Sequence, residues 1–370
     1  MPNKRYRSTF VLALTLMLSI MPVRSMAEVA AYHPVVDDLV LRLDDRPQLK
    51  QLLSDAIDVA DVDGVDSLEA FYSYTSELMG WVPVEREVVS RLLPLFYIAN
   101  QASDDGLNKD DEFSKWLKDA VDAYGDFLDS PESAAGIESF ASMPNYNLDD
   151  YFVSPSGWLT FNQFFAREMR PGKRPIAAPR DDRVIVSPAD AVFMGSWPVN
   201  TDSTITVKGV NWAISDLLDG SPYQDAFKGG IYTHSFLYID DYHRYHVPVG
   251  GTVKEIRNIS GKVYMDVGVD DDGRFTVVDG ETYQFNQERG LVIIDSPEVG
   301  LVAVLPIGMS YVSSVNLTPE QGATLQKGDE FGFFLFGGSD VVMLFQDHGI
   351  KLDAQVGTKY LQGQRLGSIP

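Results

Sequence analysis

The spacing of apolar residues changes along this chain from the period of a helix to the period of a strand. Between residues 35 and about 142, apolar side chains recur three and four positions apart, most clearly from Asp111 to Asp129. From Val184 onwards, short runs of Val, Ile, Tyr and Phe alternate with Gly and Asp turns, which is typical of strands joined by hairpins. The sequence therefore predicts an α+β protein, with a helical N-terminal domain followed by a β-rich domain.

Several individual elements can be placed from the same pattern. Further helices are expected at Pro47–Val59 and Val84–Asn100, and Pro94 is expected to kink or split the second. A Pro-, Asn- and Asp-rich hinge follows over residues 143–157, so the domains are expected to cover 28–150 and 151–370. After a short helix around Phe161–Arg167, the expected strands include Thr204–Val207, Val249–Ile256, Leu291–Asp295, Leu301–Leu305, Tyr311–Val315, Phe331–Phe336 and Val341–Phe345.

The first 27 residues have the order of a secretory signal peptide. A basic head that contains Lys4, Arg5 and Arg7 precedes an apolar run from Phe10 to Met21, and Ser25-Met26-Ala27 offers a small-residue cleavage site. We therefore expect residues 1–27 to be removed and the protein to be secreted or periplasmic. The alternative is a membrane anchor formed by residues 10–21, although that run is short of the ~20 residues that a membrane span needs.

Charge and cysteine content exclude several functions. The formal net charge is −23, so phosphate-rich nucleic acid repels the chain and anionic lipid surfaces do not favour it. The chain has no cysteine, which excludes disulfides and a thiol nucleophile. Nothing in the sequence decides whether the chain forms a homo-oligomer.

Three short segments in the β-rich half carry residue types suited to chemistry. Asp190 ends the segment Ser187-Pro188-Ala189-Asp190, directly after an expected strand. His243 and His246 lie three residues apart beside acidic residues, and histidine transfers protons well near neutral pH. Two glycines precede Ser339 between two apolar strands. Each segment alone is also explained by a turn or by structural histidines, and no third ligand set indicates a metal.

Together, these segments resemble the phosphatidylserine decarboxylase family, whose members make a pyruvoyl group from an internal serine. The likeness extends from about Gly157 to Phe345, in family order and with family-like separations. The segments that carry it are Phe161–Arg167, Arg170–Ile176, Ser187–Asp190, Lys208-Gly209, Asp241–Val249, Lys327–Glu330 and Phe336–Ser339.

The resemblance implies a role for each of the singled-out residues. Asp190, His246 and Ser339 would form a self-processing triad, in which His246 removes the proton of the Ser339 hydroxyl. Cleavage between Gly338 and Ser339 would give a β chain that starts near Glu28 and an α chain of residues 339–370, which stay together. Ser339 would become the pyruvoyl cofactor, which removes CO2 from an amine substrate through a Schiff base, and His243 would assist that step.

Two positions depart from the family pattern. Asp340 follows the processing serine where Thr or Ser is usual, and Ala191 replaces the usual glycine after Asp190. A carboxylate at position 340 would either oppose an oxyanion and slow cleavage or point to solvent. Neither departure removes a member of the triad, so we expect an active enzyme.

A second resemblance indicates which substrate the enzyme uses. The segments Asp126–Ala134, Tyr146-Asn147, Gly157-Trp158 and Thr233–Leu237 are similar to the branch that includes fungal L-tryptophan decarboxylases. This favours a free aromatic L-amino acid as substrate, with His234 and Tyr242 as candidate pocket residues. The alternatives are the conversion of phosphatidylserine to phosphatidylethanolamine in phospholipid biosynthesis, a serine hydrolase, and a secreted binding protein that does not process itself.

Overall fold

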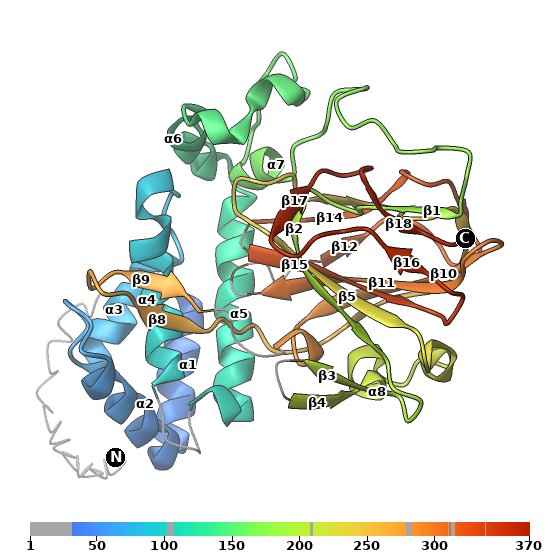
Figure 1. Ribbon diagram of the computed structural model, residues 1–370. Coiled ribbons are helices and arrows are strands. Elements are labelled where there is room, and N and C mark those ends of the chain that lie inside the picture. Colours follow the sequence, from blue (N-terminus) through green and yellow to red (C-terminus); the bar gives the residue numbers. More distant parts are fainter. Residues whose placement is uncertain are drawn as a thin grey trace, which may run out of the picture. The chain divides into compact units, whose positions relative to one another are not determined.

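The computed structural model describes residues 32–101, 107–207, 210–278, 283–309, 311, 315–336 and 338–370. The predicted signal peptide, residues 1–27, and the alternative anchor at 10–21 lie outside the described residues. Residues 32–370 form one compact unit, in which a helical part precedes a β-rich part (Figure 1). The predicted α+β class is therefore confirmed. None of the described helices is both long enough and apolar enough to cross a membrane.

The helices lie close to the positions that the apolar periodicity predicts. Helix α4 continues through Pro94 as one element, so the expected split does not occur. The α-helices are α1 (Pro34–Asp45), α2 (Pro47–Ala60), α3 (Leu68–Leu78), α4 (Val88–Asn100), α5 (Asp111–Leu128), α6 (Ile137–Ala141), α7 (Phe161–Phe165) and α8 (Ile214–Leu218). The 3-10 helices are η1 (Glu85–Glu87), η2 (Leu107–Lys109), η3 (Pro131–Gly136), η4 (Pro144–Tyr146), η5 (Leu148–Asp150), η6 (Gln224–Phe227) and η7 (Tyr283–Phe285).

Helix α5 packs between the other N-terminal helices and the β-rich part (Figure 1). The carboxylate of Asp110 caps its N-terminus by accepting hydrogen bonds from the next helical N–H groups at 3.0 Å. Its buried stripe includes Tyr124, whose ring packs edge-on against Tyr311 at 5.4 Å and Phe336 at 6.4 Å between ring centroids. One hydrophobic core therefore runs from the helices to the segment that precedes Ser339.

The strands of the β-rich part are distributed over several sheets. The largest has the order β13-β7-β10-β11-β15-β5-β2-β17 within the described residues, and smaller sheets have the orders β12-β14-β6 and β1-β18-β16. The strand bounds are β1 (Val184–Val186), β2 (Ala191–Pro198), β3 (Thr204–Val207), β4 (Val210–Ala213), β5 (Ile231–Leu237), β6 (Arg244–His246), β7 (Gly251–Ile259), β8 (Val267–Val269), β9 (Phe275–Val277), β10 (Arg289–Ser296), β11 (Gly300–Met309), β12 (Val315–Leu317), β13 (Thr324–Leu325), β14 (Glu330–Phe334), β15 (Gly338–Phe345), β16 (Lys351–Leu352), β17 (Thr358–Tyr360) and β18 (Arg365–Ser368).

Strand β15 lies inside the large sheet, with antiparallel partners β11 and β5 on its two sides. Its neighbour in sequence, β14, pairs with β12 and β6 instead, so the chain changes sheets just before Ser339. The expected strand Tyr311–Val315 is partly wrong, because Tyr311 lies in a turn and β12 begins at Val315. Residues 312–314 lie outside the described residues.

Candidate active site

Asp190 lies between β1 and β2, and an arginine fixes its carboxylate. The side chain is 3% exposed, and Arg174 donates from Nε to Oδ1 at 3.0 Å and from Nη2 to Oδ2 at 2.6 Å. The backbone N–H of Gln362 adds a third hydrogen bond at 2.8 Å. A carboxylate this deeply buried needs such partners to remain ionised. Sequence reasoning did not single out Arg174, although it lies in one of the segments that carry the family resemblance.

His246, at the end of β6, has its tautomer fixed by its two partners. Nδ1 lies 2.9 Å from the carbonyl oxygen of Gly328, which can only accept, so Nδ1 carries the hydrogen. Nε2 therefore accepts from the hydroxyl of Tyr242 at 3.0 Å. Burial lowers the pKa of His246, and the hydrogen bond to Gly328 and then the charges of Glu330 and Asp190 partly oppose this shift. A neutral imidazole with its lone pair on Nε2 is the form that a general base needs.

His243 lies directly before β6 and is completely buried. Its Nδ1 donates to the carbonyl oxygen of Asp241 at 3.0 Å, so Nε2 again carries the lone pair. The ring lies 4.0 Å from the ring of Phe165, and burial lowers the pKa of His243 to about 3. Among the described residues, Nε2 has no hydrogen-bond partner. This nitrogen is therefore a neutral, unoccupied acceptor inside the protein.

Ser339 is the second residue of β15, opposite Gly308 on β11 and Leu237 on β5. Its side chain is completely buried, and Oγ has no hydrogen-bond partner within the described ranges. The hydroxyl is thus not bonded to His246 in this structure, and the predicted triad of Ser339, His246 and Asp190 is not assembled as a relay. The loop that carries His243 leaves β5 directly after Leu237, so it starts beside Ser339.

The segment before the cleavage position is firmly anchored. Phe336 packs edge-on against Phe161 at 5.0 Å and Phe165 at 5.3 Å. Its backbone N–H donates to Oδ1 of Asn162 at 3.3 Å, and Nδ2 of Asn162 donates to Asp129 at 3.0 Å. Gly337 lies outside the described residues. The chain is therefore held on the N-terminal side of Gly338 by packing and on the C-terminal side by the sheet.

Asp340 does not point to solvent, so that expectation is wrong. Its side chain is completely buried, and Oδ1 lies 3.2 Å from Nε2 of His234. Because side chains alternate along a strand, Asp340 and Ser339 lie on opposite faces of β15. The structure thus gives His234 a charged partner on the far face of the sheet from Ser339, whereas Tyr242 contacts His246 directly.

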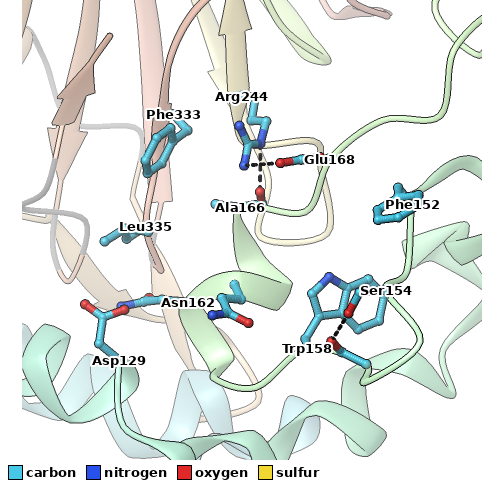
Figure 2. Close-up of a pocket in the computed structure, with 12 residues that line it drawn as sticks. Asp129, Phe152, Ser154, Trp158, Asn162, Ala166, Glu168, Arg244, Phe333 and Leu335 are labelled. Carbon is cyan, nitrogen blue, oxygen red and sulfur yellow. Dashed lines mark hydrogen bonds and ion pairs between the residues drawn. The ribbon is translucent and has the colours of Figure 1, made fainter.

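Residues of β6, β14, α7 and the segment 152–158 line a pocket of about 340 Å³ (Figure 2). Arg244 donates from Nε to the carbonyl oxygen of Ala166 at 2.8 Å, and its Nη2 lies 3.7 Å from Glu168. Aromatic and charged side chains both line this pocket: Phe152, Trp158 and Phe333 among the former, and Asp129, Glu168 and Arg244 among the latter. It therefore offers an apolar wall together with groups of both charge signs. Sequence reasoning missed this pocket, although Arg244 lies between the two predicted histidines.

Across the described ranges, His, Asp and Glu side chains form no group of three that could hold a metal ion. The roles inferred from the sequence for Asp190, His243, His246 and Ser339 stay predictions at this point. What the structure adds is a buried imidazole at His243 and a half-buried one at His246, each with its lone pair on Nε2, and one buried serine hydroxyl without a partner among the described residues.

Comparison with known proteins places most of the β-rich part in one family. Residues 161–368 match the family model described as phosphatidylserine decarboxylase. Phosphatidylserine decarboxylase proenzyme 2 of Oryza sativa subsp. japonica is 34% identical over 242 residues, which are 65% of this chain and 38% of the rice protein. Phosphatidylserine decarboxylase proenzyme of Clostridium perfringens (strain SM101 / Type A) is 30% identical over 260 residues, 66% of this chain and 83% of the relative.

A third relative carries a different name. Decarboxylase iboD of Amanita muscaria is 27% identical over 284 residues, which are 67% of this chain and 81% of that protein. The chain spans little more than a third of the rice relative and 26% of a Schizosaccharomyces pombe proenzyme. The helical residues before position 161 lie outside the family match.

Proposed function

The chain belongs to the phosphatidylserine decarboxylase family, a family of pyruvoyl-dependent carboxy-lyases, and we propose that it is a self-cleaving decarboxylase proenzyme. It cuts its backbone between Gly338 and Ser339 and then removes CO2 from an amino-acid-type substrate. The observation that carries the proposal is the buried hydroxyl of Ser339, which has no partner among the described residues and follows a glycine at the start of β15. A structural serine at such a site normally has its hydroxyl bonded.

Self-cleavage needs only groups of this chain and one water. Nε2 of His246 accepts the hydroxyl proton of Ser339 while Oγ attacks the carbonyl carbon of Gly338. The amide becomes an ester and the nitrogen of Ser339 becomes a free amine. Loss of the Cα proton of residue 339 then expels the Gly338 carboxylate, and water replaces the amine nitrogen, which leaves as ammonia. Residue 339 is left as a pyruvoyl group at the start of the α chain.

In this proposal, the observed hydrogen bonds are those of the chain before cleavage. Tyr242 now donates to Nε2 of His246, so the imidazole must exchange the tyrosine hydroxyl for that of Ser339 before it acts. Asp190 supports the base through its charge, since this charge raises the pKa of His246 against the effect of burial. The Arg174 guanidinium holds Asp190 in place.

The residues around Ser339 fit a pyruvoyl group formed there. The side chain of Ser339 is completely buried and the residue before it is a glycine, so a small ketone fits the space that the serine side chain fills. When formed, the group supplies an electron acceptor for the pair of electrons released as CO2 leaves. Nε2 of His243 is a buried acceptor without a partner in the described ranges. We assign it to accept a proton from the ammonium group of the substrate and to return that proton to the substrate carbon after CO2 has left.

For the substrate, we favour a free aromatic L-amino acid. The pocket beside β14 offers Trp158 as an aromatic wall and Arg244, which also pairs with Glu330 at 2.7 Å, as a cation near a substrate carboxylate (Figure 2). Leu335 also lines it, and this residue lies only four positions before Ser339. The resemblance of the helical part to tryptophan decarboxylases leads to the same substrate.

Phosphatidylserine is the second candidate, and two observations favour it. The rice and clostridial relatives are named for that substrate. Three apolar side chains beside the same pocket are also exposed, namely Phe152 at 54%, Val153 at 39% and Leu159 at 54%. Such a group would suit an acyl chain or a lipid surface.

CO2 release from L-tryptophan and from phosphatidylserine vesicles separates the two candidates. For a free aromatic amino acid, Trp158→Ala should raise KM about tenfold, the effect of losing a well-packed aromatic contact. The double variant Val153→Ser/Leu159→Ser changes two exposed residues that do not line the pocket, and it should leave that KM unchanged. Activity on vesicles alone, lost in the double variant, would replace the first substrate by the second.

A further inference from the structure

The carboxylate of Asp340 and the imidazole of His234 form a buried pair beside the cleavage position. Their closest atoms, Oδ1 and Nε2, are 3.2 Å apart, and the side chains are 0% and 9% exposed. Nε2 of Gln284 lies 3.4 Å from the same imidazole nitrogen. Burying a carboxylate is unfavourable unless charged or hydrogen-bonding groups surround it, so this pair is a specific feature of the fold.

The pair joins two neighbouring strands diagonally. In the register of β5 and β15, His234 lies opposite Val342 and Asp340 lies opposite Phe236. A diagonal neighbour on the same face of a sheet is within reach of a long side chain. On this face Val342 packs into the core that α8 also joins, whereas Val341 packs into the core on the face of Ser339. The pair therefore ties β15 to β5 without entering the space around Ser339.

Cleavage changes what holds residue 339 in place. Before the cut, Phe336 anchors the chain on one side of Ser339 and the sheet holds the other side. After the cut, residue 339 is a chain terminus, and strand termini fray when only backbone hydrogen bonds hold them. Asp340 is the first residue after the cut whose side chain contacts a polar side chain on another strand, His234 on β5.

We propose that the His234–Asp340 pair is a positioning device that keeps residue 339 in register between β11 and β5 once the backbone has been cut. This inference rests on the proposed function. It makes Asp340 a positioning residue rather than an obstacle to processing, and it assigns His234 a role on the far face of the sheet from Ser339. The pair acts on the reaction only through the position of residue 339.

The test compares Asp340→Ala, Asp340→Asn and Val342→Ala in the full chain. We expect all three to be cut. Asp340→Ala should lower kcat about tenfold, because a buried polar group of His234 loses its contact with the carboxylate, and KM should stay near that of the wild type. Asp340→Asn should retain most of kcat, because its amide oxygen can keep the polar contact with Nε2 of His234. Val342→Ala, on the same face, should lower Tm and leave kcat unchanged.

Hydrogen exchange of the peptide that starts the α chain gives a readout independent of turnover. It should be faster than wild type in Asp340→Ala and near wild type in Asp340→Asn. The inference is overturned if Asp340→Ala keeps wild-type kcat, or if Val342→Ala loses kcat equally. It is also overturned if both Asp340 variants stay whole while Val342→Ala is cut, because the pair would then act before cleavage. A wild-type chain that stays whole would instead remove the proposed function, and this inference with it.

Discussion

The substitution Arg174→Met removes the arginine that holds Asp190. The two side chains are 9% and 4% exposed, and three N···O contacts of 2.6–3.1 Å join them. Without Arg174, the backbone N–H of Gln362 is the one hydrogen bond that the described part of the chain leaves to the carboxylate of Asp190. Leaving one charge of a buried pair without its partner costs about 3–5 kcal/mol. This is a large share of the ~5–15 kcal/mol by which a folded protein is stable.

Urea unfolding followed by tryptophan fluorescence measures this cost. The background should be Ser339→Ala, so that every variant is a single chain. Adding Asp190→Asn to Arg174→Met should recover part of the loss, because no buried charge then lacks a partner. As a matched control, Arg365→Met breaks the more exposed pair with Asp353 and should cost at most about 1 kcal/mol.

The result also bears on chemistry, because the same arginine fixes the carboxylate that supports His246. In the chain with Ser339 intact, Arg174→Met should slow self-cleavage as well as destabilise the fold. A loss below about 1 kcal/mol in Arg174→Met would refute the reasoning, since Asp190 could then not be a buried anion that depends on this arginine.

Three further predictions concern the histidines and the serine. Tyr242→Phe removes the hydroxyl that donates to Nε2 of His246, so it should speed self-cleavage. The appearance of the α chain on a gel measures the rate. Slower cleavage would mean that the hydroxyl assists the base. His246→Ala should leave the chain whole, because Ser339 loses its base, and two chains from this variant would remove His246 from the mechanism. Burial lowers the pKa of His243 from 6.5 to about 3, so the unfolded state binds a proton at this histidine at a higher pH than the folded state does. The stability that this group contributes is therefore lost as the pH falls from about 6.5 towards 3. His243→Gln should flatten the pH dependence of urea unfolding in this window, whereas the exposed His348→Gln should not, and an unchanged slope in His243→Gln would contradict the burial of a neutral imidazole.

Local patterns predicted much of the fold. The stripe on α5 could be read because each of its apolar residues contacts the same core, and strand β3 was predicted at its observed bounds. Strand pairing could not be read in this way, because it depends on residues far apart in sequence. Nothing local indicates that β14 and β15, which are adjacent in the chain, belong to different sheets.

The candidate site shows the same division. Asp190, His243, His246 and Ser339 were found because they lie in short segments that resemble a family. The partners that hold them were not found: Arg174 lies in a different segment from Asp190, and Gly328 offers His246 only a backbone carbonyl. The alternation of side chains along β15 predicts that Asp340 and Ser339 face opposite sides of the sheet. Only the packing of the core that contains Val342 and α8 shows that the face of Asp340 is buried.

Intact mass spectrometry of the purified protein under denaturing conditions tests the central claim most directly. We predict two chains. The smaller should span residues 339–370 and be lighter, by the mass of one ammonia, than the same peptide with an N-terminal serine. In Ser339→Ala only the whole chain should appear. A wild-type protein found as one uncut chain that includes both Gly338 and Ser339 would contradict the account, because no pyruvoyl group could then form.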